Sequence, residues 1–174
     1  PQEACAIVAG NYDDVSVFAL SDEREETLLN KQTECCLMWT TDSGDPVGVY
    51  MNFVWAKGSF WLTATKQRAR MKAYAKRPRG AIAITSRGTD IGISQAVTYK
   101  GDIVLHDSDE VKTWFYAALA ARVRPESVDR QRAFVEHLDT PMRLVIELKP
   151  DVRIGFDADA MFKGSAAGPS RTQV

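Results

Sequence analysis

Seven cations gather in residues 65–80, TKQRARMKAYAKRPRG, a stretch that contains no carboxylate. The formal net charge of the whole 174-residue chain is only −1, so this stretch stands out from the rest. Clustered Lys and Arg side chains bind anions, and the planar guanidinium group suits phosphate. The segment is therefore a phosphate site, a nucleic-acid surface or a solvated face. Its cations are Lys66, Arg68, Arg70, Lys72, Lys76, Arg77 and Arg79.

Arg68 and Arg70 lie where cations are unfavourable. The segment predicts a short helix that begins at Thr65 or Gln67 and is closed by the following proline. Both arginines then fall in the first turn, where free backbone N–H groups and the helix dipole already form a positive end. Each added cation costs roughly a few tenths of a kcal/mol there unless an anion is bound. A phosphate would accept hydrogen bonds from these N–H groups, from both guanidinium groups and from the hydroxyl of Thr63 or Thr65.

The remaining residues disfavour nucleic acid as the partner. A duplex-binding domain usually spreads its basic surface over several elements, whereas this chain has a net charge near zero. Phe60 and Trp61 are neighbours on one predicted strand and point to opposite faces, so they do not form a stacking platform. Lys72 and Lys76 are one helical turn apart, as on a solvated face.

The composition excludes several other classes of protein. At this length, with 45% hydrophobic and 26% charged residues, we expect one soluble domain. No apolar run reaches the roughly 20 residues that span a membrane, and the first ten residues do not resemble a secretory signal, so we expect a cytoplasmic protein. The cysteines, Cys5, Cys35 and Cys36, predict no disulfide framework. His106 and His137 lack the spacing of a zinc site, so no metal is predicted.

Alternating hydrophobic residues follow a first predicted helix over residues 22–31. Three runs, ECCLMWTT, VGVYMNFVW and SFWLTAT, have the period of two that is typical of half-buried antiparallel strands. The turns DSGDP and AKG separate them. This order predicts a meander of three strands. Asp22 and Asp107 each precede a glutamate by three residues, which is the spacing of a helix capping box.

The second half of the chain completes an antiparallel barrel. GAIAIT and the long strand ISQAVTYKGDIVLHD follow the basic helix, and Gly101 in the long strand predicts a bulge or bend that helps to close a barrel. Two helices then precede a last strand, MRLVIELKPDVRIGF. The fold class is mainly β with helices (α+β), a barrel of six or seven strands. We expect an N-terminal extension over residues 1–20, one domain over 21–162 and a disordered tail over 163–174.

The order of these elements resembles the flavin-binding split-barrel family, the pyridoxamine 5'-phosphate oxidase-like proteins that include flavin and deazaflavin reductases. The resemblance extends from about residue 28 to residue 162. It rests on the meander, on TKQRARMKAYAKRPRGAIAIT, on TYKGDIVLHD and on TPMRLVIELKP. It implies a split antiparallel β-barrel that forms a homodimer and binds two flavin nucleotides, such as FMN, at the interface.

The resemblance also implies which residues contact the cofactor. The second predicted strand would run along the flavin ring, mainly through its backbone. Arg70 would replace the family's phosphate-binding lysine, with Arg68 as a second cation and Thr63 as a hydroxyl ligand, and Gln95 would contact the ring or the interface. The full set of cofactor-binding candidates is Val47, Val49, Tyr50, Met51, Asn52, Leu62, Thr63, Thr65, Lys66, Arg68, Arg70 and Gln95. No catalytic residue is assigned, because in such sites the cofactor carries the chemistry.

Departures from the family pattern narrow the function. Val47 and Asn52 stand where the true oxidase carries Arg and Lys, and its C-terminal Trp and Arg pattern is absent from DVRIGFDADAMF. Vitamin B6 oxidation is therefore not expected. The resemblance implies an FMN-dependent oxidoreductase that acts on a small planar substrate. The alternatives are a reductase that uses 8-hydroxy-5-deazaflavin (factor 420), whose polyglutamate tail would contact Lys66, Lys72 and Lys76, and a non-catalytic flavin-binding or sequestering protein.

Overall fold

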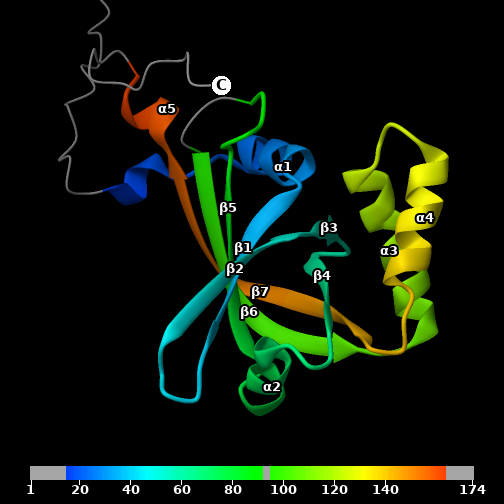
Figure 1. The fold of residues 1–174 in the computed structure, drawn as a ribbon. Coiled ribbons are helices and arrows are strands. Elements are labelled where there is room, and N and C mark those ends of the chain that lie inside the picture. The colour runs from blue at the N-terminus through cyan, green and yellow to red at the C-terminus, as the bar shows by residue number, and fades with distance from the viewer. Residues whose placement is uncertain (1–14, 92–94, 164–174) are drawn as a thin grey trace, which may run out of the picture.

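A computed structural model describes residues 15–91 and 95–163 of the chain (Figure 1). The strands are β1 (Glu34–Thr40), β2 (Pro46–Asn52), β3 (Val54–Ala56), β4 (Ser59–Thr65), β5 (Arg79–Thr85), β6 (Gln95–His106) and β7 (Arg143–Asp157). The helices are α1 (Asp22–Lys31), α2 (Ala69–Lys76), α3 (Asp109–Val123), α4 (Val128–Leu138) and α5 (Ala158–Met161), with a 3-10 helix η1 (Val15–Phe18). The predicted α+β fold class is confirmed.

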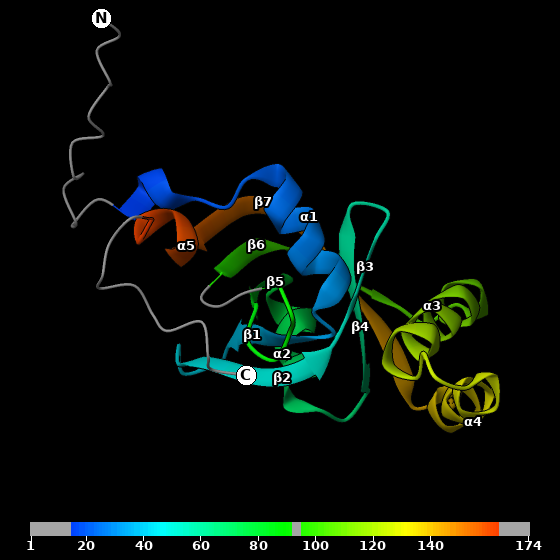
Figure 2. The same cartoon turned by 90° about the horizontal axis from the view of Figure 1, so that it is seen from above.

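All seven described strands form one antiparallel sheet in the order β2-β1-β5-β6-β7-β4-β3. The sheet curls into a barrel, with α1 and α5 toward one end and α2 at the other (Figure 1). The helices α3 and α4 pack together at the side of β4 and β7, as the view from above also shows (Figure 2). This arrangement positions the basic helix α2 between the β1–β2 hairpin and the end of β4 (Figure 1).

The single strand predicted over VGVYMNFVW is wrong, because the chain divides there into β2 and β3. The backbone N–H of Phe53 donates to the carbonyl of Thr33 at 3.2 Å, and its side chain is fully buried in the barrel. Residues before Phe53 pair with β1, and residues after it pair with β4. The two edges of the sheet are therefore joined through one residue, which closes the barrel. Alternation alone gave no sign of this turn, because Phe53 continues the hydrophobic period.

The bulge predicted at Gly101 is confirmed. Lys100 pairs with Val152 and Gly101 pairs with Pro150, so Asp151 is the extra residue on β7. A Cβ atom at Gly101 would lie 2.0 Å from the carbonyl oxygen of Lys149. Glycine is therefore required for the two long strands to approach each other at this point.

Two hydrophobic cores lie on the two faces of β4. Phe60 and Leu62 are fully buried inside the barrel, whereas Trp61 packs beneath α3 with Phe115 and Tyr116. The prediction that Phe60 and Trp61 point to opposite faces is confirmed. Burying both faces fixes the register of β4, and with it the place where α2 begins.

Serine residues, rather than the predicted aspartates, cap two of the helices. The hydroxyl oxygens of Ser21 and Ser108 accept hydrogen bonds from backbone N–H groups of the first turns of α1 and α3. Asp22 lies in the first turn of α1, and Asp107 precedes the cap of α3. The acidic residues there still complement the positive helix ends. No helix in the described part of the chain is long and apolar enough to cross a membrane.

Candidate functional site

The basic helix α2 begins without the usual cap. Its N-cap residue is Arg68, whose side chain makes no capping hydrogen bond, and its first turn contains no acid. The N–H of Arg68 donates to the carbonyl of Thr65 at 3.1 Å, which forms the turn that leads out of β4. Met71 and Tyr74 anchor the other face of α2 in the barrel core. The predicted short helix is thus confirmed, but its start is wrong: α2 begins at Ala69 rather than at Thr65 or Gln67, because the turn from Thr65 to Arg68 comes first. Arg68 is therefore the N-cap residue, and Arg70 lies in the first turn.

Acidic side chains neutralise four of the seven cations in the segment. Lys66 pairs with Asp107 at 2.7 Å, Lys76 and Arg77 pair with Asp42 at 2.7 and 2.8 Å, and Arg79 pairs with Asp102 at 3.0 Å and with Asp151. Hydrogen bonds from Lys76 and Arg77 hold the pKa of Asp42 below its usual value. These acids come from distant parts of the sequence, so the segment itself gave no indication of the pairing.

Arg68, Arg70 and Lys72 form no ion pair with any of the described residues. Arg68 and Lys72 are exposed, whereas Arg70 is half-buried and its Nε atom is fully buried without a hydrogen-bond partner. Burial, together with the nearby charge of Arg68, lowers the pKa of Arg70. A buried guanidinium nitrogen without an acceptor among the described residues is unfavourable, so an anion bound at this position would be stabilising.

The candidates on β4 are mostly engaged within the protein. Leu62 is fully buried and pairs with Ile146. The hydroxyl of Thr63 donates to the carbonyl of Leu144 at 2.9 Å, on the face of β4 that α3 covers. Thr65 is half-buried at the end of the strand, beside the uncapped start of α2. Of these three residues, Thr65 is the one that the structure brings next to the unpaired arginines.

Strand β2 lies at an edge of the sheet and pairs only with β1 among the described strands. Backbone N–H and C=O groups on its other edge therefore pair with no described strand and can bind a ligand. Val49 and Met51 pack partly on the barrel core, whereas Tyr50 points outward with 74% of its surface exposed. Asn52 donates from its side chain to the carbonyl of Thr33 at 3.1 Å. Val47 is half-buried near the hairpin end.

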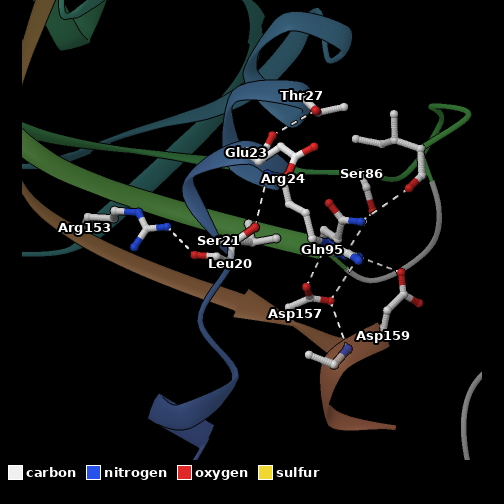
Figure 3. A network of polar contacts seen from close by, with 12 residues as sticks. Leu20, Ser21, Glu23, Arg24, Thr27, Ser86, Gln95, Arg153, Asp157 and Asp159 are labelled. Carbon is white, nitrogen blue, oxygen red and sulfur yellow. Dashed lines mark hydrogen bonds and ion pairs between the residues drawn. The ribbon is translucent and has the colours of Figure 1, made fainter. Parts of the chain in front are cut away.

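Gln95 lies far from the cations of α2. It begins β6 opposite Asp157, at the end of the barrel where α1 and α5 lie, and Figure 3 shows it beside Ser86. Its backbone N–H donates to the Ser86 hydroxyl at 3.1 Å, and its side chain donates to the Ile91 carbonyl at 3.3 Å. It is six residues along β6 from Gly101, roughly 20 Å at the usual rise of a strand. The structure therefore places Gln95 at the opposite end of the barrel from α2.

Two pockets on the outer face of the sheet were not predicted from the sequence. One, of about 360 Å³, lies between the β1–β2 hairpin and the end of α2, and Met38, Trp39 and Ala81 contribute to its apolar lining. The other, of about 430 Å³, lies between β1, β2 and the turn after β5. Sequence alternation indicated which side chains point outward, but not where they leave a hollow. Among the described residues, no group of three or more His, Cys, Asp or Glu side chains is arranged to hold a metal ion.

Solved structures match this arrangement of strands over most of the chain. A conserved hypothetical protein from Mycobacterium tuberculosis is 14% identical, with a TM-score of 0.70 over 80% of this chain and 86% of that one. An F420 reductase is 18% identical, with a TM-score of 0.58 over 74% and 94%. A candidate pyridoxamine 5'-phosphate oxidase from Listeria innocua is 14% identical, with a TM-score of 0.57 over 76% and 95%. The chain has the fold of the flavin-binding split-barrel family.

The split barrel is used by proteins with different ligands. Besides the F420 reductase, the matching structures include an FAD-binding protein and two heme-binding proteins. No protein-family model and no curated protein sequence matches the chain. The split-barrel fold that the resemblance implied is therefore confirmed, and the ligand has to be argued from the residues of this chain.

Proposed function

We propose that the chain is a flavin-dependent oxidoreductase that binds FMN and transfers a hydride to or from a small planar substrate. The phosphate would lie at the start of α2, on Arg68 and Arg70. The observation that carries this proposal is the buried Nε atom of Arg70, which has no acceptor in the described part of the chain. It lies at a helix start that has neither a side-chain cap nor an acid in its first turn. Bound phosphate would supply the missing acceptor and the missing negative charge.

The residues of the site fit a flavin nucleotide. Two unpaired guanidinium groups and the free N–H groups of α2 suit a phosphate dianion, and the open edge of β2 offers alternating donors and acceptors to the polar side of a planar ring. Val49 and Met51 would provide apolar contacts beside it. When bound, FMN would supply the hydride chemistry, and the protein would bind and orient it and exclude water.

The pairing of the lysines favours FMN over a deazaflavin with a polyglutamate tail. Lys66 and Lys76 would have to leave Asp107 and Asp42 to hold that tail, which leaves Lys72 as the free lysine of the segment. Breaking two exposed ion pairs costs roughly 0.4–2 kcal/mol in total, so we expect the protein to bind FMN about two- to thirtyfold more tightly than the tailed deazaflavin. Titration calorimetry with both cofactors, and with a deazaflavin that lacks the tail, measures the difference. Tighter binding of the tailed form would replace FMN with deazaflavin in the proposal.

A homodimer is proposed on the outer face of β2, β1, β5, β6 and β7, which none of the described helices covers. Two rows of residues cross this face: Tyr50, Cys36, Ala83, Thr98 and Ile154, and then Gly48, Met38, Ala81, Lys100 and Val152. Tyr50 and Ile154 are 74% and 56% exposed, and Val152 is 37% exposed. Small and apolar side chains without a covering helix are typical of an interface between subunits.

Ile154→Glu is expected to convert the dimer to a monomer. The introduced carboxylate would be buried without a partner on both sides of the twofold interface, which is strongly unfavourable. Light scattering after size exclusion measures the mass. Glu136→Gln, on the exposed surface of α4, serves as the control and should remain dimeric. A monomeric wild-type protein would refute the dimer.

The visible spectrum tests the cofactor and the activity together. We expect a purified protein reconstituted with FMN to be yellow, to bleach with a reductant and to recover faster with a suitable acceptor than free FMN does. Stable colour without accelerated turnover would favour the alternative of a flavin-binding or sequestering protein. If the protein instead gave a Soret band on addition of heme and had no affinity for FMN, its function would be that of the heme-binding and heme storage proteins with this fold.

A further inference from the structure

A polar pocket of about 430 Å³ opens beside β2, at the margin of the outer face, and we call it the Gln32 pocket. Its volume falls within the range of about 300–1,000 Å³ that is typical of small-molecule sites. Tyr50 and Asn52 of β2 form one wall, the start of β1 forms the floor, and the turn around Arg87 and Gly88 after β5 forms the other wall. The pocket thus adjoins the strand that we propose runs along the flavin ring.

The side chain of Gln32 builds this pocket. It is 8% exposed and uses both ends of its amide. The nitrogen donates to the carbonyls of Thr85 and Arg87 at 2.6 and 3.0 Å, and the oxygen accepts from the N–H groups of Thr33 and Glu34 at 2.9 and 3.1 Å. One buried amide therefore fixes the start of β1 and the end of β5 relative to each other, which preorganises the pocket.

Further contacts hold the two walls. The guanidinium group of Arg122, on α3, donates to the carbonyl of Gln32. In the turn after β5, Gly88 has a left-handed φ of 78°, and the hydroxyl of Thr89 donates to the carbonyl of Ser86 at 2.6 Å. Lys31 pairs with Asp90 at 3.0 Å and ties the turn to α1. These contacts connect the turn that carries Arg87 to α1 and to the end of β5.

Two opposite charges line the Gln32 pocket without pairing. Arg87 and Glu34 are both exposed, and neither forms an ion pair with the other or with any residue in the described ranges. Elsewhere on this surface, neighbouring acids neutralise cations such as Lys76 and Arg79. A pocket lined by one cation and one anion that do not pair with each other suits a ligand that carries both complementary groups.

We propose that the Gln32 pocket binds a small planar molecule that has a carboxylate at one end and an N–H donor at the other. Arg87 binds the carboxylate, Glu34 accepts from the N–H group, and Tyr50 covers the plane. That this ligand is the substrate of the enzyme rests on the proposed function. Its binding to the pocket does not. If the dimer forms as proposed, the second copy borders the mouth of the pocket.

Binding of 4-aminobenzoate, benzoate and aniline to the flavin-free full-length protein tests the proposal. Amide chemical shifts in NMR titrations give both the location and the affinity. We expect shifts at Thr33, Glu34 and Gly88, and an affinity for 4-aminobenzoate about tenfold or more above that for either fragment. Arg87→Gln should weaken the binding of 4-aminobenzoate and of benzoate by about tenfold, and it should leave the affinity for aniline unchanged. Glu34→Gln should weaken the binding of 4-aminobenzoate and of aniline, and it should leave the affinity for benzoate unchanged.

Arg130→Gln is the matched control, because Arg130 is an exposed arginine on α4 outside the pocket. It should bind all three probes like the wild type. Equal affinities for 4-aminobenzoate in wild type and Arg87→Gln, or shifts confined to other surfaces, would overturn the proposal. Binding only in the monomeric Ile154→Glu variant would also overturn it, because the partner would then fill the pocket. FMN titration is independent, so failure of the flavin assignment is distinguishable from failure of this pocket.

Discussion

Arg70→Ala is expected to weaken FMN binding by roughly 10- to 100-fold, which corresponds to about 1.5–3 kcal/mol for a hydrogen bond to a charged group. Within the α2 segment, Arg70 is the cation whose Nε atom is fully buried and has no acceptor among residues 15–91 and 95–163. Arg70 is partly desolvated and close to Arg68, so a phosphate binds more strongly to it than to an exposed lysine. Quenching of flavin fluorescence measures the dissociation constant.

Matched variants separate three contributions to FMN affinity: the positive charge, the planar geometry of the guanidinium group, and the stability of the fold. Arg70→Lys keeps the charge and should lose less affinity than Arg70→Ala, and Arg68→Ala should lose less because Arg68 is exposed. Lys76→Ala is the control, since Asp42 already neutralises this lysine. In the flavin-free protein, Arg70→Met should keep or raise the free energy of unfolding, because it removes a buried polar atom without a partner. Unchanged FMN affinity in both arginine-to-alanine variants would refute the phosphate assignment.

Gly101→Ala is expected to lower the free energy of unfolding by about 3 kcal/mol, which is a fall in melting temperature of roughly 6–12 °C for a chain of this size. The added Cβ would lie 2.0 Å from the Lys149 oxygen and 2.9 Å from the Cα of Pro150. Both are backbone atoms, so the backbone of the bulge between β6 and β7 has to move to relieve these clashes. Thermal and urea unfolding measure the change.

Gly48→Ala provides the comparison for stability, because it also adds one methyl group on a strand. Its nearest contact is the Sγ atom of Cys36, at 2.7 Å, and a side-chain atom can rotate away. We therefore expect a cost of about 1 kcal/mol or less. Equal effects of the two substitutions would show that the bulge adapts and that Gly101 is not required for closure.

The sequence predicted the features that local chemistry controls. Alternation placed Phe60 and Trp61 on opposite faces, the glycine at position 101 marked the bulge, and the run of cations before Pro78 indicated the short helix. Each of these depends on residues that are close in sequence. Local electrostatics also led to the prediction of an anion site at Arg68 and Arg70, because two cations crowd one helix start. Neither arginine has an acidic partner in the described structure, which agrees with that prediction.

The rest of the site depends on residues that meet only after folding. Arg79 and Lys66 are paired with acids 72 and 41 residues away, so no local rule separates them from the unpaired arginines. At the break, the N–H of Phe53 donates to the carbonyl of Thr33, 20 residues earlier in the sequence, and the chain then leaves β1 to pair with β4. The Gln32 pocket is lined by three segments, and one buried amide joins two of them, the start of β1 and the end of β5. Long-range geometry of this kind is not encoded in hydrophobic periodicity.

The pairing of β4 with β7 also governs when the protein can fold during synthesis. Thr63 and Leu144, which are joined by a hydrogen bond across this pair, are 81 residues apart. At about 5–20 residues per second, a ribosome needs roughly 4–16 seconds to make the chain between them. During that time β4 has β3 as its partner and its other edge is open, which is a template for aggregation. The barrel can close only after β7 emerges, so nascent chains that stall before residue 143 are clients for chaperones rather than folded domains.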